Sequence, residues 1–74
     1  MRYNQRIRAL REEMGFTQQR IADQLNVGQR TYCDYEQGKT RIPVDSIVKL
    51  AKLYNVSVDY IVGASDIKGI FPIK

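Results

Sequence analysis

Two neighbouring side chains, Gln29 and Arg30, carry hydrogen-bonding groups that match the edges of DNA bases. A glutamine amide can pair bidentately with adenine, and an arginine guanidinium can pair in the same way with guanine. Such side chains reach base edges when they stand in the exposed first turn of a helix that enters the major groove. The pattern predicts a helix that begins at Gln29, so the pair indicates recognition of double-stranded DNA.

The next residues along this predicted helix add polar groups that can each make more than one kind of contact with DNA. Thr31 can contact a thymine methyl group or a phosphate. Asp34 follows Arg30 by one helical turn, and three roles stay open for it: accepting a hydrogen bond from cytosine, rejecting wrong sequences, or pairing with Arg30. Cys33 stands beside it without any histidine or second cysteine in the chain. We therefore expect no metal site, no cofactor and no redox role.

A preceding segment is suited to contact phosphates. Gln18 occupies the first position of a predicted helix, where its amide and the free backbone N–H groups can both meet a phosphate. Arg20 lies at the third helical position, where a positive charge opposes the helix dipole. A nearby phosphate and a tolerated surface position are both consistent with this arginine. We include Gln18 and Arg20 among the candidate DNA-binding residues.

Two short helices are needed to position these side chains. Thr17 is a suitable N-cap for the first, and apolar residues at 21, 22 and 25 form a single stripe along it. Asn26 can end that helix in the left-handed conformation, and Gly28 can cap the next one. In the second helix, Tyr32 and Tyr35 share one face and leave the opposite face free. The pattern is a helix-turn-helix.

Three more helices are predicted around this unit. One runs from about Asn4 to Met14, with Ile7, Leu10 and Met14 facing inward. Another follows a proline, and its apolar residues repeat with the spacing 0, 3, 4, 7: Ile47, Leu50, Ala51 and Tyr54. A short last helix is capped by Ser57 and stopped by Gly63. The chain is thus predicted to be all-α.

These residues together resemble the XRE family, the helix-turn-helix domains of lambdoid phage repressors and Cro proteins. The resemblance runs from about residue 4 to residue 66 and includes these segments: Gly15-Phe16-Thr17-Gln18, Ile21-Ala22, Tyr35-Glu36-Gln37-Gly38-Lys39, Leu50-Ala51 and Val56-Ser57-Val58-Asp59-Tyr60. It implies a compact five-helix, lambda-repressor-like domain with the helix-turn-helix at its second and third helices.

The resemblance also implies roles for residues outside the two reading helices. It places Lys39, Thr40 and Arg41 in a loop along the phosphate backbone. It matches Arg11 and Glu36 to a partly buried ion pair that fixes the recognition helix against the domain. Four tyrosines fall on apolar stripes or on core positions of the family, so they are expected in the core rather than stacked on bases: Tyr32, Tyr35, Tyr54 and Tyr60.

Length and composition bound the function. A chain of 74 residues has room for one small core, and its net charge of +4 with a pI near 9.5 is consistent with a polyanionic partner. The sequence has one cysteine, no apolar run long enough to span a membrane and no visible signal peptide. We expect a cytoplasmic, nucleoid-associated protein. We do not expect an enzyme, because no nucleophile and base can be paired.

The last eight residues are unusually apolar for a chain terminus. Residues 1–66 are expected to form the DNA-binding domain, and 67–74 a tail whose apolar side chains need burial: Ile67, Ile70, Phe71 and Ile73. The tail can dock on its own domain or across a two-fold axis, and we favour the dimer. 

The sequence therefore predicts a DNA-binding transcriptional regulator, a repressor that binds a palindromic operator as a homodimer. The alternative is an antitoxin-type interaction module that masks a partner protein and represses its own operon. That alternative predicts an apolar patch away from the recognition helix.

Overall fold

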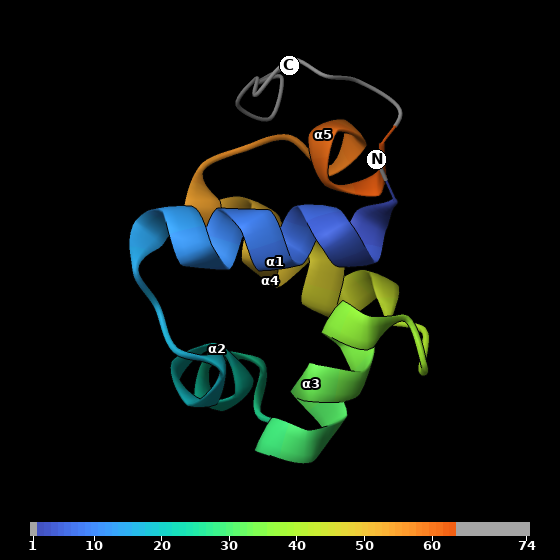
Figure 1. The fold of residues 1–74 in the computed structure, drawn as a ribbon. Coiled ribbons are helices and arrows are strands. Elements are labelled where there is room, and N and C mark those ends of the chain that lie inside the picture. The colour runs from blue at the N-terminus through green and yellow to red at the C-terminus, as the bar shows by residue number, and fades with distance from the viewer. Residues whose placement is uncertain (1, 64–74) are drawn as a thin grey trace.

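Five helices follow one another in the computed structural model, which describes residues 2–63 (Figure 1). Their bounds are α1 (Tyr3–Met14), α2 (Gln18–Leu25), α3 (Gln29–Gln37), α4 (Val44–Tyr54) and α5 (Val58–Val62). Residues 2–63 contain no strand. The predicted all-α, five-helix fold is confirmed. The boundary at residue 66 and the tail at 67–74 lie outside the described residues.

The helices divide between two ends of the molecule (Figure 1). α2 and α3 pack on each other at one end, α5 lies at the other, and α1 crosses between them, in contact with both α3 and α5. α4 packs against α5. The pair α2 and α3 is therefore supported from one side and open on the other.

The helix ends follow the predicted caps. The Thr17 hydroxyl accepts a hydrogen bond from the Arg20 backbone N–H at 3.1 Å, and the Ser57 hydroxyl accepts from that of Tyr60 at 3.0 Å. Asn26 adopts the left-handed conformation with φ 62°. Each of the two N-caps contributes on the order of 1 kcal/mol and fixes where its short helix starts, whereas Asn26 ends α2.

Gly38, which ends α3, is required by its backbone and by its neighbour. Its φ is 77°, where side chains are strained, and a Cβ there would lie 3.3 Å from the Asn4 amide nitrogen. That nitrogen donates to the backbone carbonyl of Glu36 at 3.2 Å. The end of α3 is thus held against the start of α1.

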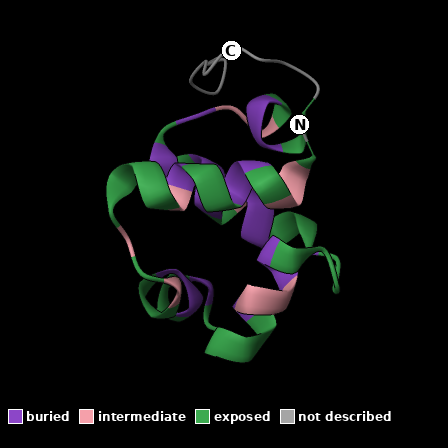
Figure 2. Cartoon of the chain, viewed as in Figure 1, coloured by how far each residue is buried: buried purple, intermediate pink, exposed green. Residues whose placement is uncertain are grey.

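The core draws on every helix, and Figure 2 shows the buried segments facing the interior. All four tyrosines assigned to the core are buried there, which confirms the assignment. The largest fully enclosed side chains are Ile7, Ile21, Tyr32, Leu50 and Ile61. Because Tyr32 and Tyr35 pack inward with their rings edge to face, one face of α3 is fixed by the core.

The inward face of α1 differs from the prediction at two positions. Met14 was expected inside but is 52% exposed, because it lies in the last turn of α1, on the rim of a groove shared with Tyr54 and Val56. Arg6 is buried instead, although its side chain ends in a charged guanidinium group. The guanidinium carbon lies 4.0 Å from the centre of the Tyr60 ring. The cation–π contact and the aliphatic stem make that burial favourable.

Candidate nucleic-acid interface

The first turn of α3 is the exposed part of the helix-turn-helix. Gln29, Arg30 and Thr31 are all exposed, whereas Tyr32 directly after them is fully buried. This turn lies at the free edge of the molecule, at the lower end of the view in Figure 1, and Figure 2 shows it exposed. The structure therefore presents together the side chains that the sequence singled out for reading bases.

Asp34 forms an ion pair with Arg30 one turn earlier on α3. The Asp34 Oδ1 atom lies 3.8 Å from the Arg30 Nε atom, with side-chain exposures of 25% and 88% respectively. Of the three roles left open for Asp34, pairing with Arg30 is the one seen in the DNA-free chain. Contact with cytosine and rejection of wrong sequences stay predictions.

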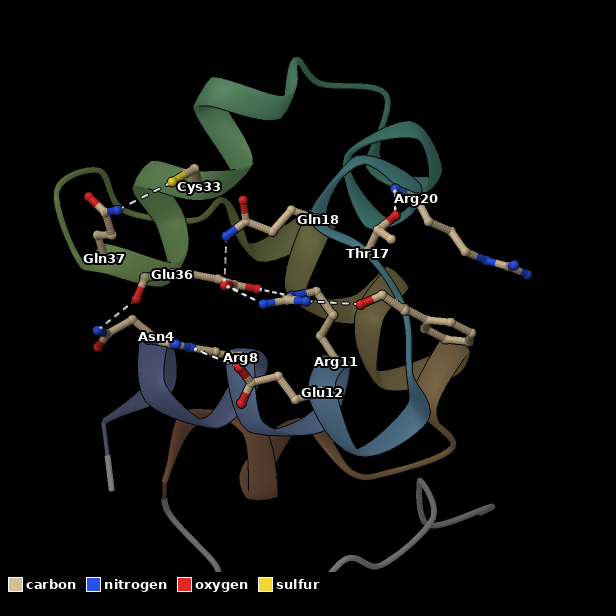
Figure 3. Close-up of polar contacts among 11 residues, drawn as sticks. Asn4, Arg8, Arg11, Glu12, Thr17, Gln18, Arg20, Cys33, Glu36 and Gln37 are labelled. Atoms are coloured by element: carbon tan, nitrogen blue, oxygen red, sulfur yellow. Dashed lines mark hydrogen bonds and ion pairs between the residues drawn. The ribbon is translucent and has the colours of Figure 1, made fainter.

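A buried carboxylate, Glu36, ties α3 to the rest of the domain (Figure 3). Arg11 on α1 donates to both of its oxygens, from Nε to Oε2 at 2.7 Å and from Nη2 to Oε1 at 3.2 Å. The side chains are 13% and 3% exposed, so this is the partly buried pair that the resemblance implies. Arg11 also donates from Nη1 to the Phe16 carbonyl at 2.9 Å, which adds the segment before α2 to the same anchor.

The protonation states of this pair follow from its partners. Burial alone raises the pKa of Glu36, but hydrogen bonds from Arg11 and Gln18 outweigh it, so the pKa of the carboxyl lies below its ordinary value. The hydrogen bond to Glu36 likewise raises the pKa of Arg11, although burial opposes it. Both groups are therefore charged at neutral pH.

Gln18 has a role that the sequence did not indicate. Its amide nitrogen donates to Glu36 Oε1 at 3.1 Å, so the first residue of α2 is linked to α3 (Figure 3). Only one of the two amide hydrogens is used in this bond, and the backbone N–H groups at the start of α2 are a separate source of donors. The bond joins residues 18 apart, which no local pattern reveals. Phosphate contact by Gln18 stays a prediction.

Arg20 contacts an aromatic ring. Its guanidinium carbon lies 4.7 Å from the centre of the Phe16 ring, while the side chain stays exposed. The cation–π contact offsets the unfavourable position of a positive charge near the start of α2. The structure thus explains why an arginine is tolerated there without a phosphate, although it leaves the side chain accessible to one.

The loop after α3 carries the other predicted phosphate contacts. Lys39, Thr40 and Arg41 are all exposed. The backbone N–H of Lys39 donates to the Asp34 carbonyl at 2.9 Å, which folds the loop onto the end of α3. Cationic side chains therefore stand at both ends of this helix. Cys33 is half-buried between them and accepts a hydrogen bond from the Gln37 amide at 3.3 Å.

Neither a metal site nor a membrane span is found in the part of the chain that the structure describes. Over residues 2–63, no group of three or more potential metal-binding side chains is close enough to hold an ion. In the same range, each helix is too short or too polar to cross a membrane.

Comparisons with known proteins agree with this geometry. A helix-turn-helix family model matches residues 7–61. The uncharacterized HTH-type transcriptional regulator YobD of Bacillus subtilis is 41% identical over 64 residues, which are 86% of this chain and 57% of that protein. The cryptic phage CTXphi transcriptional repressor RstR of Vibrio cholerae is 34% identical over 64 residues, 86% of this chain and 58% of that protein. The chain thus spans little more than half the length of these relatives.

A solved structure has the same fold. The P22 c2 repressor, crystallised with a synthetic operator, superposes with a TM-score of 0.78 over 88% of this chain and 98% of that one. The sequences are 22% identical, so this likeness concerns the fold.

Proposed function

The chain belongs to the XRE-type helix-turn-helix family, and on that premise we propose that it is a sequence-specific DNA-binding transcriptional regulator that acts as a repressor. The observation that carries the proposal is the first turn of α3, where Gln29 and Arg30 are exposed. The same helix is joined to α1 by the ion pair between Arg11 and Glu36. A recognition helix needs both properties, because mobile base-reading groups lose entropy on binding.

We assign the candidate residues to two kinds of contact. Gln29 and Arg30 read adenine and guanine in the major groove, and Thr31 contacts a thymine methyl group or a phosphate. The backbone of the DNA is held by the start of α2, which carries Gln18 and Arg20, and by the loop after α3, with Lys39, Thr40 and Arg41. This division follows the positions of these side chains, which are exposed except for the partly buried Gln18.

Repression by such a domain needs only occupancy of an operator. The proposal therefore includes no catalysis and no cofactor, and it places the protein on the chromosome in the cytoplasm. The relatives named above are described as a transcriptional regulator and a transcriptional repressor, which supports this direction of control.

The alternative of an interaction module has weaker support. Among residues 2–63, large apolar side chains are exposed on three helices other than α3: Met14, Val44, Leu53 and Val62. Four such side chains on three helices do not by themselves define the single apolar patch that this alternative predicts, and individual exposed apolar residues are normal for a small domain.

Selection of binding sites from random duplex DNA tests the proposal directly. We expect enrichment of a palindromic motif, since a two-fold dimer places two copies of α3 one helical turn apart. A dimer that neutralises about 6–8 phosphates should also show a log–log salt slope of about −5 to −7 on the selected site. No enrichment, together with a slope near zero, would contradict DNA-binding regulation.

Dimerisation through the tail is a separate prediction. Deletion of residues 67–74 is expected to remove apolar side chains that pair across the two-fold axis, so the truncated protein should sediment as a monomer at micromolar concentration. Its operator affinity should fall, because each half-site is then bound independently, while the preferred bases stay the same. A truncated protein that remains dimeric and binds the operator as tightly as the full chain would show that the tail has no such role.

A further inference from the structure

The two side chains of the Arg30–Asp34 ion pair differ in burial: Asp34 is largely enclosed, and Arg30 extends into solvent. Asp34 is three-quarters buried, and its backbone carbonyl is held by the Lys39 N–H at 2.9 Å, whereas Arg30 is 88% exposed. A short carboxylate on a packed helix has few rotamers to lose, and a long arginine has many. The carboxylate therefore acts as the fixed point of the pair, and the arginine is the side chain whose direction it sets.

This pair contributes little to folding. The charges are 3.8 Å apart and one of them is in water, a geometry in which the pair has almost no effect on stability. At a protein–DNA interface the situation differs, because water is displaced and the phosphates supply a strong negative field. The two charges then influence where Arg30 goes far more than they influence whether the domain folds.

The contact between Asp34 and Arg30 involves the Nε atom of the guanidinium and not its outer edge. Asp34 approaches the Nε atom of Arg30, so both terminal nitrogens, Nη1 and Nη2, are available for other acceptors. Two parallel donors are what guanine O6 and N7 require. A phosphate competes for the same donors, but a phosphate close to Arg30 also comes close to the Asp34 carboxylate and is repelled by it.

We propose that Asp34 is a positioning residue for specificity, which keeps Arg30 away from phosphates and directs it to guanine. This inference rests on the proposed DNA-binding function and deepens it. Asp34 lowers affinity for non-operator DNA while preserving affinity for the operator. The charge that looks unfavourable on a DNA-binding face thereby increases the difference between right and wrong sites.

The test compares Asp34→Asn with Asp59→Asn. Both variants remove one negative charge with little change in shape, but Asp59 is exposed on α5, at the opposite end of the molecule from α2 and α3 (Figure 1). Affinities are measured for the selected operator, for the operator with its guanine replaced, and for random DNA. Thermal melts check that both variants stay folded.

For Asp34→Asn, we expect affinity for random DNA to rise and the ratio of operator to random binding to fall roughly 10-fold, with the guanine preference reduced. The salt slope on random DNA should steepen by about one per chain, because Arg30 gains a phosphate contact. Asp59→Asn should leave ratio and slope near wild type. In an Arg30→Ala background, Asp34→Asn should behave like Asp59→Asn.

Other outcomes overturn the inference in distinguishable ways. Equal effects of Asp34→Asn and Asp59→Asn would mean that only net charge matters. Loss of a cytosine preference with the guanine preference intact would make Asp34 a direct base contact instead. If the wild-type protein itself selects no sequence, the proposed function fails, and this inference fails with it.

Discussion

Replacing Glu36 with alanine is expected to destabilise the domain by about 2–4 kcal/mol, and so is replacing Arg11. Each variant leaves the opposite charge buried without its main partner, and the cost of such a charge exceeds the value of the pair itself. Glu36 →Ala also removes the acceptor of the Gln18 amide, so the start of α2 loses its link to α3. Urea melts at neutral pH measure the change in the free energy of unfolding.

The chain offers a matched control in Arg8→Ala. Arg8 pairs with Glu12 at 3.2 Å on the surface of α1, with side-chain exposures of 63% and 54%. Exposed pairs at this spacing contribute about 0.3–0.5 kcal/mol, so this variant should stay close to wild type. If Glu36→Ala and Arg11→Ala both fall within about 0.5 kcal/mol of wild type, the pair does not anchor the recognition helix.

The pH dependence of stability gives a second readout of the same anchor. The pKa of Glu36 is lower in the folded chain than its ordinary value of 4.5, so the unfolded chain binds its proton more readily. The contribution of Glu36 to the free energy of unfolding is therefore fully present above about pH 4.5. It is lost as the pH falls through the lower pKa of the folded chain. Glu36→Gln should remove this part of the acid destabilisation. If stability falls with pH in the same way in this variant as in wild type, the ionised Glu36 carboxylate does not stabilise the fold.

The local features of the fold were predictable because their causes are local. A cap such as Thr17, or a left-handed residue such as Asn26, acts within three or four residues of its own position. The core faces of α2 and α3 follow from helical periodicity in the same way. Helical periodicity gave the wrong prediction of a buried Met14, because a helix can extend beyond the core on which it packs.

The contacts between helices were beyond local reasoning. Glu36 joins three segments of the chain, and nothing in the spacing of Arg11, Gln18 and Glu36 brings them together. The ion pair was expected only from the family resemblance, and the Gln18 bond was not expected at all. Burial of Arg6 was missed for a different reason: its favourable contact with Tyr60 exists only once α5 has packed on α1.

The candidate site was predictable as a position but not as a set of contacts. Exposure of Gln29 and Arg30 follows from the face of α3 opposite Tyr32 and Tyr35. Which bases they meet depends on the direction in which α3 enters the groove and on the shape of the DNA, and both belong to the complex. The variants that matter most are therefore those that separate reading of bases from attraction to phosphates.

Arg30→Ala is expected to weaken binding to the selected operator by about 1–3 kcal/mol, or roughly 5- to 150-fold. The reason is the loss of a bidentate contact with guanine, so preference should relax at one base pair in each half-site. Affinity for random DNA should change little, since Asp34 keeps this arginine away from phosphates in the wild-type chain. Titrations on the operator, on its single-base variants and on random DNA provide these values.

Lys39→Ala tests the proposed phosphate contacts separately from base reading. It removes the same formal charge as Arg30→Ala, but from the other end of α3. Lys39 is exposed in the loop that folds back on Asp34, and we propose that it contacts the DNA backbone. This variant should weaken all sequences by a similar factor and make the salt slope about one unit shallower per chain, with base preferences intact. If Arg30→Ala and Lys39→Ala instead behave alike on every DNA, both residues bind phosphate, and readout of the sequence has to lie with Gln29 and Thr31.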